Sequence, residues 1–251
     1  MTKFRHFVGS TLSLLWSRSA TPLAKRTQVL MYHSIGGSAD GDHRGIYSLS
    51  PNSFVEEMEL LKEQCVKNDL KIVPFGDEVP GSLSLTFDDG YRDNLHIAAP
   101  LMEKFGFPFH IFLNPTLIES GRDNFLSIED IRQLSTNPLV SLGLHGYSHE
   151  PLTSLSTQSV LKEVELAKSW FEDVVNRQAT TFSYPHGSVD DRIAYLIKQC
   201  GFTVAACSKF GPITMKSDRL RLPRIDVWST DTRRSFVAKL EGRWDWMKWR
   251  T

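Results

Sequence analysis

The chain has 251 residues, of which 41% are hydrophobic and 23% are charged, so it is long enough and apolar enough to fold around a core of its own. Its 29 Lys and Arg residues balance its 29 Asp and Glu residues, which gives a formal net charge of zero. Nucleic-acid-binding proteins usually carry a clear basic excess, so this composition argues against a nucleic acid partner.

Residues 1–27 are expected to form an N-terminal arm with a short apolar run at 7–16. The run is too short and too polar to cross a bilayer, which takes about 20 apolar residues. Arg18 makes a weak cleavage site for a signal peptide ending at Ala20. An amphipathic helix lying on a membrane surface is a third interpretation. We favour an uncleaved arm on a cytoplasmic protein, peripheral to the membrane if this arm binds lipid, over an exported protein.

Short apolar runs then alternate with longer segments of helical periodicity. The expected strands, in chain order, are 29–32, 71–74, 83–87, 109–113, 139–144, 181–184, 203–207 and 222–227. The expected helices begin at Pro51 and then cover 94–105, 127–134, 157–175 and a segment capped by Ser188 that ends at Cys200. About seven strand–helix units predict a closed or nearly closed α/β barrel of parallel strands over residues 28–229.

The last segment, 230–251, differs from the rest of the chain. A helix is expected at 232–240, and residues 243–250 then hold three of the six tryptophans beside several cations. These indoles either pack on the barrel or form a surface for a membrane interface or a sugar. The three cysteines, at positions 65, 200 and 207, include no Cys-x-x-C pair, and we expect them to be free, buried side chains.

Polar residues gather at the predicted strand ends, where α/β barrels place their chemistry. The residues at or just beyond these ends are His33, Asp88, Asp89, His145, His149, His186 and Asp226. Chance explains one or two such positions more easily than it explains the whole set. The sequence therefore predicts a site at one end of the barrel.

Two of these segments indicate a metal site. Asp88 and Asp89 are adjacent carboxylates directly after a strand, so one of them is expected to bind a cation or hold a proton; alone, the segment also fits a solvated turn. His145 and His149 lie four residues apart at another strand end. Two imidazoles and one carboxylate form a common ligand set for a catalytic divalent metal.

Two further segments are less specific. The Pro-His-Gly sequence at 185–187 either aims a backbone N–H into a pocket or simply joins a strand to a helix. Arg224 and Asp226 are two residues apart, on one face of an expected strand. They either face the site together or form an exposed ion pair.

Together these segments resemble the polysaccharide deacetylases of carbohydrate esterase family 4, the NodB-homology domain, over residues 29–227. The resemblance rests on Thr-Phe-Asp-Asp-Gly at 86–90 and His-Gly-Tyr-Ser-His at 145–149. Tyr-His-Ser-Ile at 32–35 resembles the branch that includes poly-N-acetylglucosamine deacetylases. The resemblance implies a distorted (β/α)7 barrel that uses a divalent metal, most often Zn²⁺, to remove N-acetyl groups from an amino sugar in a polysaccharide or its glycan precursor.

The resemblance also implies roles for individual residues. Asp89, His145 and His149 are expected to bind the metal, and Asp88 is the expected general base. The backbone N–H of His186 is expected to contribute to an oxyanion hole.

The chain departs from the family pattern at two points. Ser183 stands where the family has an Arg that holds the base, and Arg224 is the expected substitute. No His follows His186, where the family usually supplies its general acid. Because the motif order is permuted in the Tyr-His-x-Ile branch, His33 is the expected acid, assisted by Asp226. His186 is the second choice.

Three other functions compete with this one. The departures favour an inactive relative that binds carbohydrate without cleaving it. A glycosidase using Asp88 and a second carboxylic acid would leave both imidazoles without a role. A metal-dependent deacetylase of another amide, such as a peptide, fits the same motifs.

Overall fold

Apolar runs of the chain form the strands of one parallel sheet. The computed structural model describes residues 23–249, and its main sheet has the strand order β10-β1-β5-β6-β7-β8-β9, with β4 paired to β5 beside this path. The strand bounds are β1 Gln28–Tyr32, β4 Lys71–Ile72, β5 Ser82–Phe87, β6 Phe109–Leu113, β7 Val140–Leu144, β8 Thr181–Ser183, β9 Val204–Ala206 and β10 Ile225–Asp226. A separate two-stranded sheet pairs β2 (Ser34–Ile35) with β3 (Ser48–Leu49).

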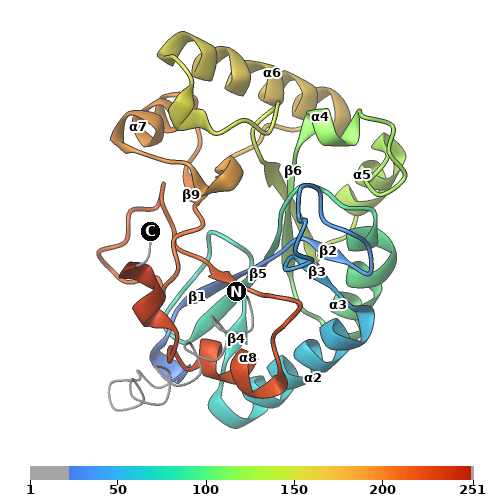
Figure 1. Ribbon diagram of the computed structural model, residues 1–251, viewed down its shortest axis with the longest axis vertical. Helices are drawn as coiled ribbons and strands as arrows, with labels where there is room; N and C mark the ends of the chain where they lie inside the picture. The colour runs from blue at the N-terminus through green and yellow to red at the C-terminus, as the bar shows by residue number, and fades with distance from the viewer. Residues whose placement is uncertain (1–22, 250–251) are drawn as a thin grey trace.

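Helices lie around the outside of the curved sheet (Figure 1). Their bounds are α2 Pro51–Asn68, α3 Ala99–Phe105, α4 Pro115–Ile118, α5 Ile128–Ser135, α6 Thr157–Val175, α7 Asp191–Gln199 and α8 Arg233–Leu240. The path of seven parallel strands with outer helices is a distorted (β/α)7 barrel, so the predicted fold class is confirmed.

The distortion lies where the edge strands β9 and β10 approach each other. The segment before β10 bonds to β9 instead of β10 itself: Leu222 N–H donates to Ala205 O at 2.8 Å, and Cys207 N–H donates to Leu222 O at 3.0 Å. The Arg224 N–H then donates to Lys209 O at 2.9 Å, beyond the end of β9. The predicted strand at 222–227 is therefore wrong at its start, and residue 224 sits at the seam of the barrel.

Two other predicted elements also differ from the structure. The helix expected at 94–105 begins as a π-helix, Asn94–Ala98, because Pro100 removes a donor near the start of α3. Asp190, not Ser188, caps α7 by accepting a hydrogen bond from Ile193 N–H at 2.8 Å. Ser188 is still part of the preceding turn, where its N–H donates to Pro185 O.

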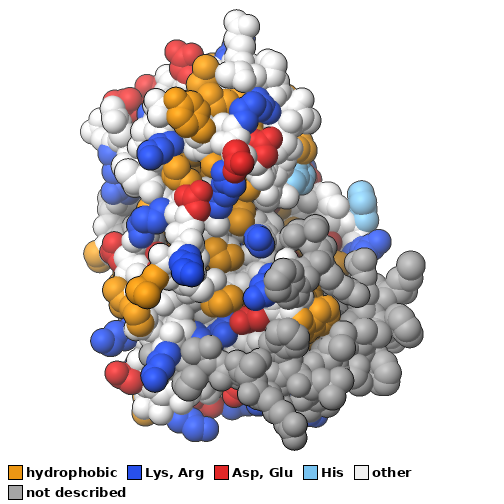
Figure 2. Space-filling view, turned by 90° about the vertical axis from the view of Figure 1, so that its left-hand side faces the viewer, with side chains coloured by type: hydrophobic (Ala, Val, Ile, Leu, Met, Phe, Trp, Pro, Cys, Tyr) orange, Lys and Arg blue, Asp and Glu red, His pale blue; other side chains and the backbone are white. Residues whose placement is uncertain are grey.

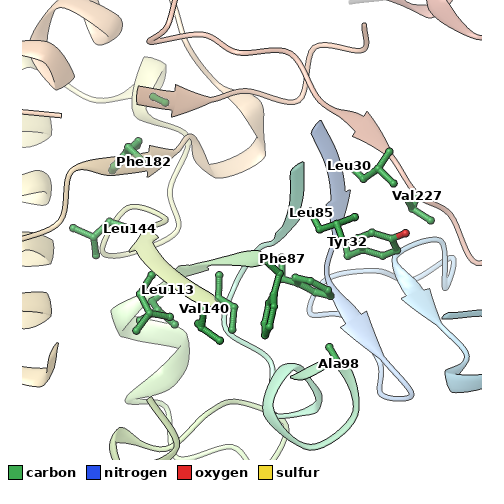
Figure 3. Packing of buried hydrophobic residues seen from close by; sticks show 14 of the residues in the cluster. Leu30, Tyr32, Leu85, Phe87, Ala98, Leu113, Val140, Leu144, Phe182 and Val227 are labelled. Atoms are coloured by element: carbon green, nitrogen blue, oxygen red, sulfur yellow. The ribbon is translucent and has the colours of Figure 1, made fainter. Parts of the chain in front are cut away.

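The core of the barrel is apolar and aromatic. Every residue of β1 and β5 is buried, as expected for parallel strands covered on both faces. Phe87 at the end of β5 stacks on Tyr32 at the end of β1, with ring centroids 5.3 Å apart (Figure 3). This packing makes the strand ends a rigid support for the residues that follow them.

The C-terminal segment packs on the barrel. The Trp244 side chain is 2% exposed and belongs to the main core cluster. Arg26 donates from both terminal nitrogens to Asp245, at 3.0 and 2.9 Å. Of the two interpretations of this segment, packing on the barrel therefore describes Trp244. The apolar run at 7–16 lies outside the described residues.

The three cysteines differ in burial. All three cysteines are free, but only Cys207 is buried; Cys65 and Cys200 are half-buried, so that part of the prediction is wrong. Figure 2 shows acidic and basic side chains interspersed on one face of the molecule. Within residues 23–249, no helix is long and apolar enough to span a bilayer.

Glu57 is a buried carboxylic acid that contacts the end of β1 from helix α2. Glu57 of α2 accepts a hydrogen bond from the Tyr32 hydroxyl at 3.0 Å. Burial, with the nearby charge of Asp231, raises the pKa of Glu57 to about 8. The unfolded chain has a Glu pKa of about 4.3. Because the folded value is the higher one, the contribution of Glu57 to stability is fully present below about pH 4 and is lost as the pH rises toward 8.

We therefore expect Glu57→Gln to raise the free energy of unfolding by about 1–3 kcal/mol at pH 9, because a neutral amide still accepts from Tyr32 without a buried charge. Urea unfolding at pH 6 and at pH 9 gives the free energy of unfolding at each pH, and so how strongly it depends on pH in each variant. Glu59→Gln is the matched control, since Glu59 is exposed on the same helix and its charge is not among those that raise the pKa of Glu57. An equal pH dependence in the wild type and Glu57→Gln would contradict the raised pKa.

Candidate active site

Three residues with left-handed backbone conformations gather beyond the strand ends. Among non-glycine residues in the described chain, φ is positive at Asp69 and Asn176, which cap helices, and at Asp89 (74°), His149 (65°) and His186 (57°). This conformation is unfavourable for residues with a side chain and tends to persist at functional sites. The backbone strain thus coincides with the motifs that follow β5, β7 and β8.

Asp88 is held by a buried arginine. Both terminal nitrogens of Arg224 donate to its carboxylate, Nη1 to Oδ1 and Nη2 to Oδ2, each at 2.7 Å. Arg224 is fully buried and also donates to Ser183 Oγ at 2.9 Å and to Cys207 O at 3.2 Å. Burial raises the pKa of Asp88, but the charge and hydrogen bonds of Arg224 outweigh this effect and lower it to about 2.

One interpretation of the sequence was that Arg224 and Asp226 form an exposed ion pair. The structure excludes it, because the Arg224 side chain is fully buried. Arg224 comes from the seam before β10, and Ser183 ends β8. The structure thus brings Arg224 and Ser183 together around Asp88, where the family pattern has one Arg. A bidentate pair of this kind orients the carboxylate and keeps it ionised.

Asp89, His145 and His149 converge on one point. Asp89 Oδ1 lies 3.4 Å from His145 Nε2 and 3.2 Å from His149 Nε2. One ligand atom from each of the three residues lies within 4.8 Å of the others. Asp89 Oδ1 is buried, yet it accepts no hydrogen bond from any described residue. A buried carboxylate oxygen facing two imidazole nitrogens without a hydrogen bond is the arrangement that a cation satisfies.

The protonation of these groups suits metal ligands. His145 Nδ1 is 2.9 Å from Ser183 O, so this nitrogen carries the proton and Nε2 presents its lone pair toward Asp89. Burial lowers the pKa of His145 to about 4, which leaves the ring neutral at pH 7. Burial raises the pKa of Asp89. The contact with His149 and the charges of His33 and His145 lower this pKa by more than burial raises it, so the carboxyl is ionised. The residues present fit a divalent cation, and zinc accepts this mixture of ligands.

His186 lies beside this cluster on the exposed side. Its ring centroid is 4.7 Å from that of His149, and its Nε2 is 3.1 Å from His149 O. Because a carbonyl only accepts, His186 Nε2 carries a proton that is already engaged. The ring of His186 therefore supports the backbone of a candidate metal ligand.

His33 and Asp226 meet on the other side of Asp88. His33 is the single residue between β1 and β2, and its Nδ1 is buried without a hydrogen-bond partner among the described residues. The charges of Asp88, Asp89 and Asp226 all interact with His33. Asp226 accepts from the Tyr47 hydroxyl at 3.4 Å, and the Tyr47 ring packs against His33 at an interplanar angle of 41° with centroids 4.6 Å apart.

The sequence did not single out Tyr47 and Tyr91 as parts of this site. Tyr91 is fully buried directly after Gly90, and burial together with the charge of Asp89 raises the pKa of its hydroxyl. Tyr91 could have been found from its position next to the Asp-Asp-Gly turn. Tyr47 ends the loop-like stretch at 36–47, which by its sequence either lines the cleft near His33 or forms a surface loop, and its contacts with Asp226 and His33 favour the first.

The fold and the site together define a class: a parallel α/β barrel whose strand ends carry an arginine-held carboxylate next to a carboxylate and two imidazoles. The family model for polysaccharide deacetylases matches residues 76–205, which is more than half of the chain. The chain belongs to the polysaccharide deacetylase family.

Individual relatives agree with this assignment. The poly-β-1,6-N-acetyl-D-glucosamine N-deacetylase of Staphylococcus aureus is 21% identical over 214 residues, covering 78% of this chain and 73% of that enzyme. IcaB from Ammonifex degensii has a TM-score of 0.70 at 19% identity, covering 88% of this chain and 96% of that one. The Streptococcus pyogenes deacetylase PplD, solved with acetate, has a TM-score of 0.71 at 17% identity, covering 86% and 98% of the two chains. At these identities the two solved structures show a shared fold.

Proposed function

We propose that this protein is a metal-dependent hydrolase that removes N-acetyl groups from an amino sugar in a polysaccharide or its glycan precursor. The observation that carries the proposal is the juxtaposition of Asp88, fixed by Arg224, with the buried oxygen of Asp89 that faces His145 and His149. The family assignment supplies the class of reaction.

Asp89, His145 and His149 would hold the cation. A divalent metal in this position supplies Lewis-acid polarisation and makes water a better nucleophile near neutral pH. Asp88 then acts as the general base: it accepts the proton of the attacking water as the new C–O bond forms at the acetyl carbon. The bidentate contact with Arg224 orients the Asp88 carboxylate for this transfer.

The negative charge that develops on the acetyl oxygen needs donors. The backbone N–H of His186 is the candidate from this chain, since His186 follows β8 in a left-handed conformation and the family supplies a donor at this turn. One such donor is commonly worth about 3–4 kcal/mol of transition-state stabilisation.

Breaking the C–N bond requires a proton on the departing amine. His33 is the proposed donor, because its Nδ1 has no hydrogen-bond partner among the described residues and it lies close enough to Asp88 and Asp226 to interact with their charges. His186 is less suited, because its Nε2 proton is engaged by His149 O. The products are acetate and a free amino sugar.

A β-1,6-linked N-acetylglucosamine oligosaccharide is the proposed test substrate, since the Staphylococcus aureus relative is named for that polymer. We expect the purified chain to release acetate, to lose at least about 100-fold of its rate after dialysis against a zinc chelator, and to recover on adding Zn²⁺. Magnesium serves as the matched control, because it prefers oxygen ligands.

Three results would contradict parts of the proposal. Full activity after removal of bound metal would exclude metal dependence. Binding of the oligosaccharide by calorimetry without acetate release would favour the carbohydrate-binding relative. Release of acetate from an N-acetylated peptide, but not from the sugar, would favour a deacetylase of another amide.

A further inference from the structure

The backbone that carries His33 is tied to the segment that carries Asp88 and Asp89. Asn94, which is fully buried, donates from Nδ2 to the His33 carbonyl at 3.2 Å. Asp93 Oδ2 accepts from Ser34 Oγ at 2.7 Å and from Ile35 N–H at 2.8 Å. Asp93 and Asn94 thus form hydrogen bonds with residues 33, 34 and 35 of another segment.

These bonds act around the single residue that lies between strands β1 and β2. β1 and β5 pair in parallel, with Tyr32 opposite Phe87, so His33 and Asp88 leave the sheet side by side. β1 ends at Tyr32 and β2 begins at Ser34, so the carbonyl of His33 belongs to neither strand. The buried Asn94 amide supplies a donor to this carbonyl.

The pair is itself cross-linked. Asn94 Nδ2 also donates to Asp93 Oδ1 at 3.0 Å, so the two side chains orient each other. Burial raises the pKa of Asp93, and the hydrogen bonds from Ser34, Ile35 and Asn94 oppose this effect. The contacts join residues more than fifty positions apart, so they set the separation of two loops rather than the shape of one.

We infer that Asp93 and Asn94 are positioning residues for His33. By bonding residues 33–35 to the segment that follows Asp89, they set the place of the proton donor relative to the base and the metal ligands. The inference rests on the proposed function, because it takes His33 as the general acid.

Two acetylated substrates separate this role from a general structural one. Hydrolysis of the N-acetyl amide needs a proton on the leaving amine, whereas the activated ester 4-nitrophenyl acetate expels a stable phenolate without one. Both reactions use the same base and the same metal ligands. Loss of donor positioning should therefore slow the amide and spare the ester.

For Asn94→Leu we expect kcat for the oligosaccharide to fall by about 10- to 100-fold, with KM within about twofold and ester hydrolysis within about twofold of wild type. Asp93→Asn keeps the shape of the side chain and is expected to show the same selectivity with a smaller loss, so it serves if Asn94→Leu does not fold. Arg92→Ala is the matched control from the same turn, where the side chain is exposed, and should change neither rate.

A double-mutant cycle completes the test. His33→Ala should show the same selective loss, and adding Asn94→Leu to it should cost little more, because the two changes disable one proton transfer. Parallel losses on both substrates, or additive losses in the double variant, would overturn the inference. Selective loss in His186→Ala, with His33→Ala fully active, would overturn it as well.

Different results refute the proposed function and the positioning role of Asp93 and Asn94. A wild-type protein that hydrolyses neither substrate refutes the proposed function, and this inference with it. An active wild type whose Asn94→Leu and Asp93→Asn variants hydrolyse the amide at the full rate refutes the positioning role alone.

Discussion

Replacing Asp88 by Asn is expected to lower kcat for acetate release by about 10²–10⁴-fold while leaving one bound metal per chain. The amide has nearly the same shape but accepts no proton from water at neutral pH. Metal content should persist, because Asp89, His145 and His149 are unchanged. Steady-state kinetics on the oligosaccharide and metal analysis of the same sample give both numbers.

Folding of this variant must be checked separately. Asp88→Asn leaves the buried Arg224 without its counter-charge, and breaking a buried ion pair commonly costs about 3–5 kcal/mol of stability. The remaining bonds of Arg224 to Ser183 and Cys207 limit this loss. Asp123→Asn, at an exposed position, is the control for a change of one charge. A variant that is folded, metal-loaded and fully active would rule out Asp88 as the base.

Removing a candidate metal ligand, unlike replacing Asp88, is expected to lower both zinc binding and activity. Asp89→Ala or His145→Ala should weaken zinc binding by more than the 10- to 100-fold typical of losing an outer-shell partner, with activity lost in proportion. The reason is geometric: each residue contributes one of three atoms within 4.8 Å of one another. Competition with a chromophoric zinc chelator measures the affinity directly.

An exposed imidazole provides the control for these ligand variants. His96→Ala removes a histidine that lies on the surface and contacts Arg92 Nε at 3.3 Å. It should leave both zinc affinity and activity unchanged. Equal zinc affinity in the wild type and His145→Ala would show that the three residues do not hold the metal.

Local patterns were sufficient for much of the fold. The helix at 157–175 and the strand at 109–113 were predicted at both ends, because apolar periodicity and flanking polar residues act within one segment. Ser156 caps that helix by accepting from Ser159 N–H at 3.1 Å. The motifs at 86–90 and 145–149 were recognisable for the same reason, since their spacing is written into consecutive residues.

Boundaries failed where a distant segment or a turn competed. The strand expected at 222–227 shortened to β10 because its first residues bond to β9 and to Lys209 beyond it. Ser188 lost the helix cap to Asp190 because α7 begins only at Asp191 and the Ser188 hydroxyl is hydrogen-bonded to Thr153 Oγ1. Neither competitor is visible from the local pattern alone.

By itself, the sequence determined the alternation of strands and helices, the family, and the side chains available at the strand ends. Only the tertiary structure decided which of them meet. Arg224 donates to Asp88, which lies 136 positions earlier in the chain. Ser183 O sets the tautomer of His145, and the Asn94 amide donates to the His33 carbonyl. The physical reason is that a hydrogen bond tolerates a change of only a few tenths of an ångström in the donor–acceptor distance, and here donor and acceptor lie on different elements. Those distances follow from how the barrel closes, which no single segment of the chain specifies.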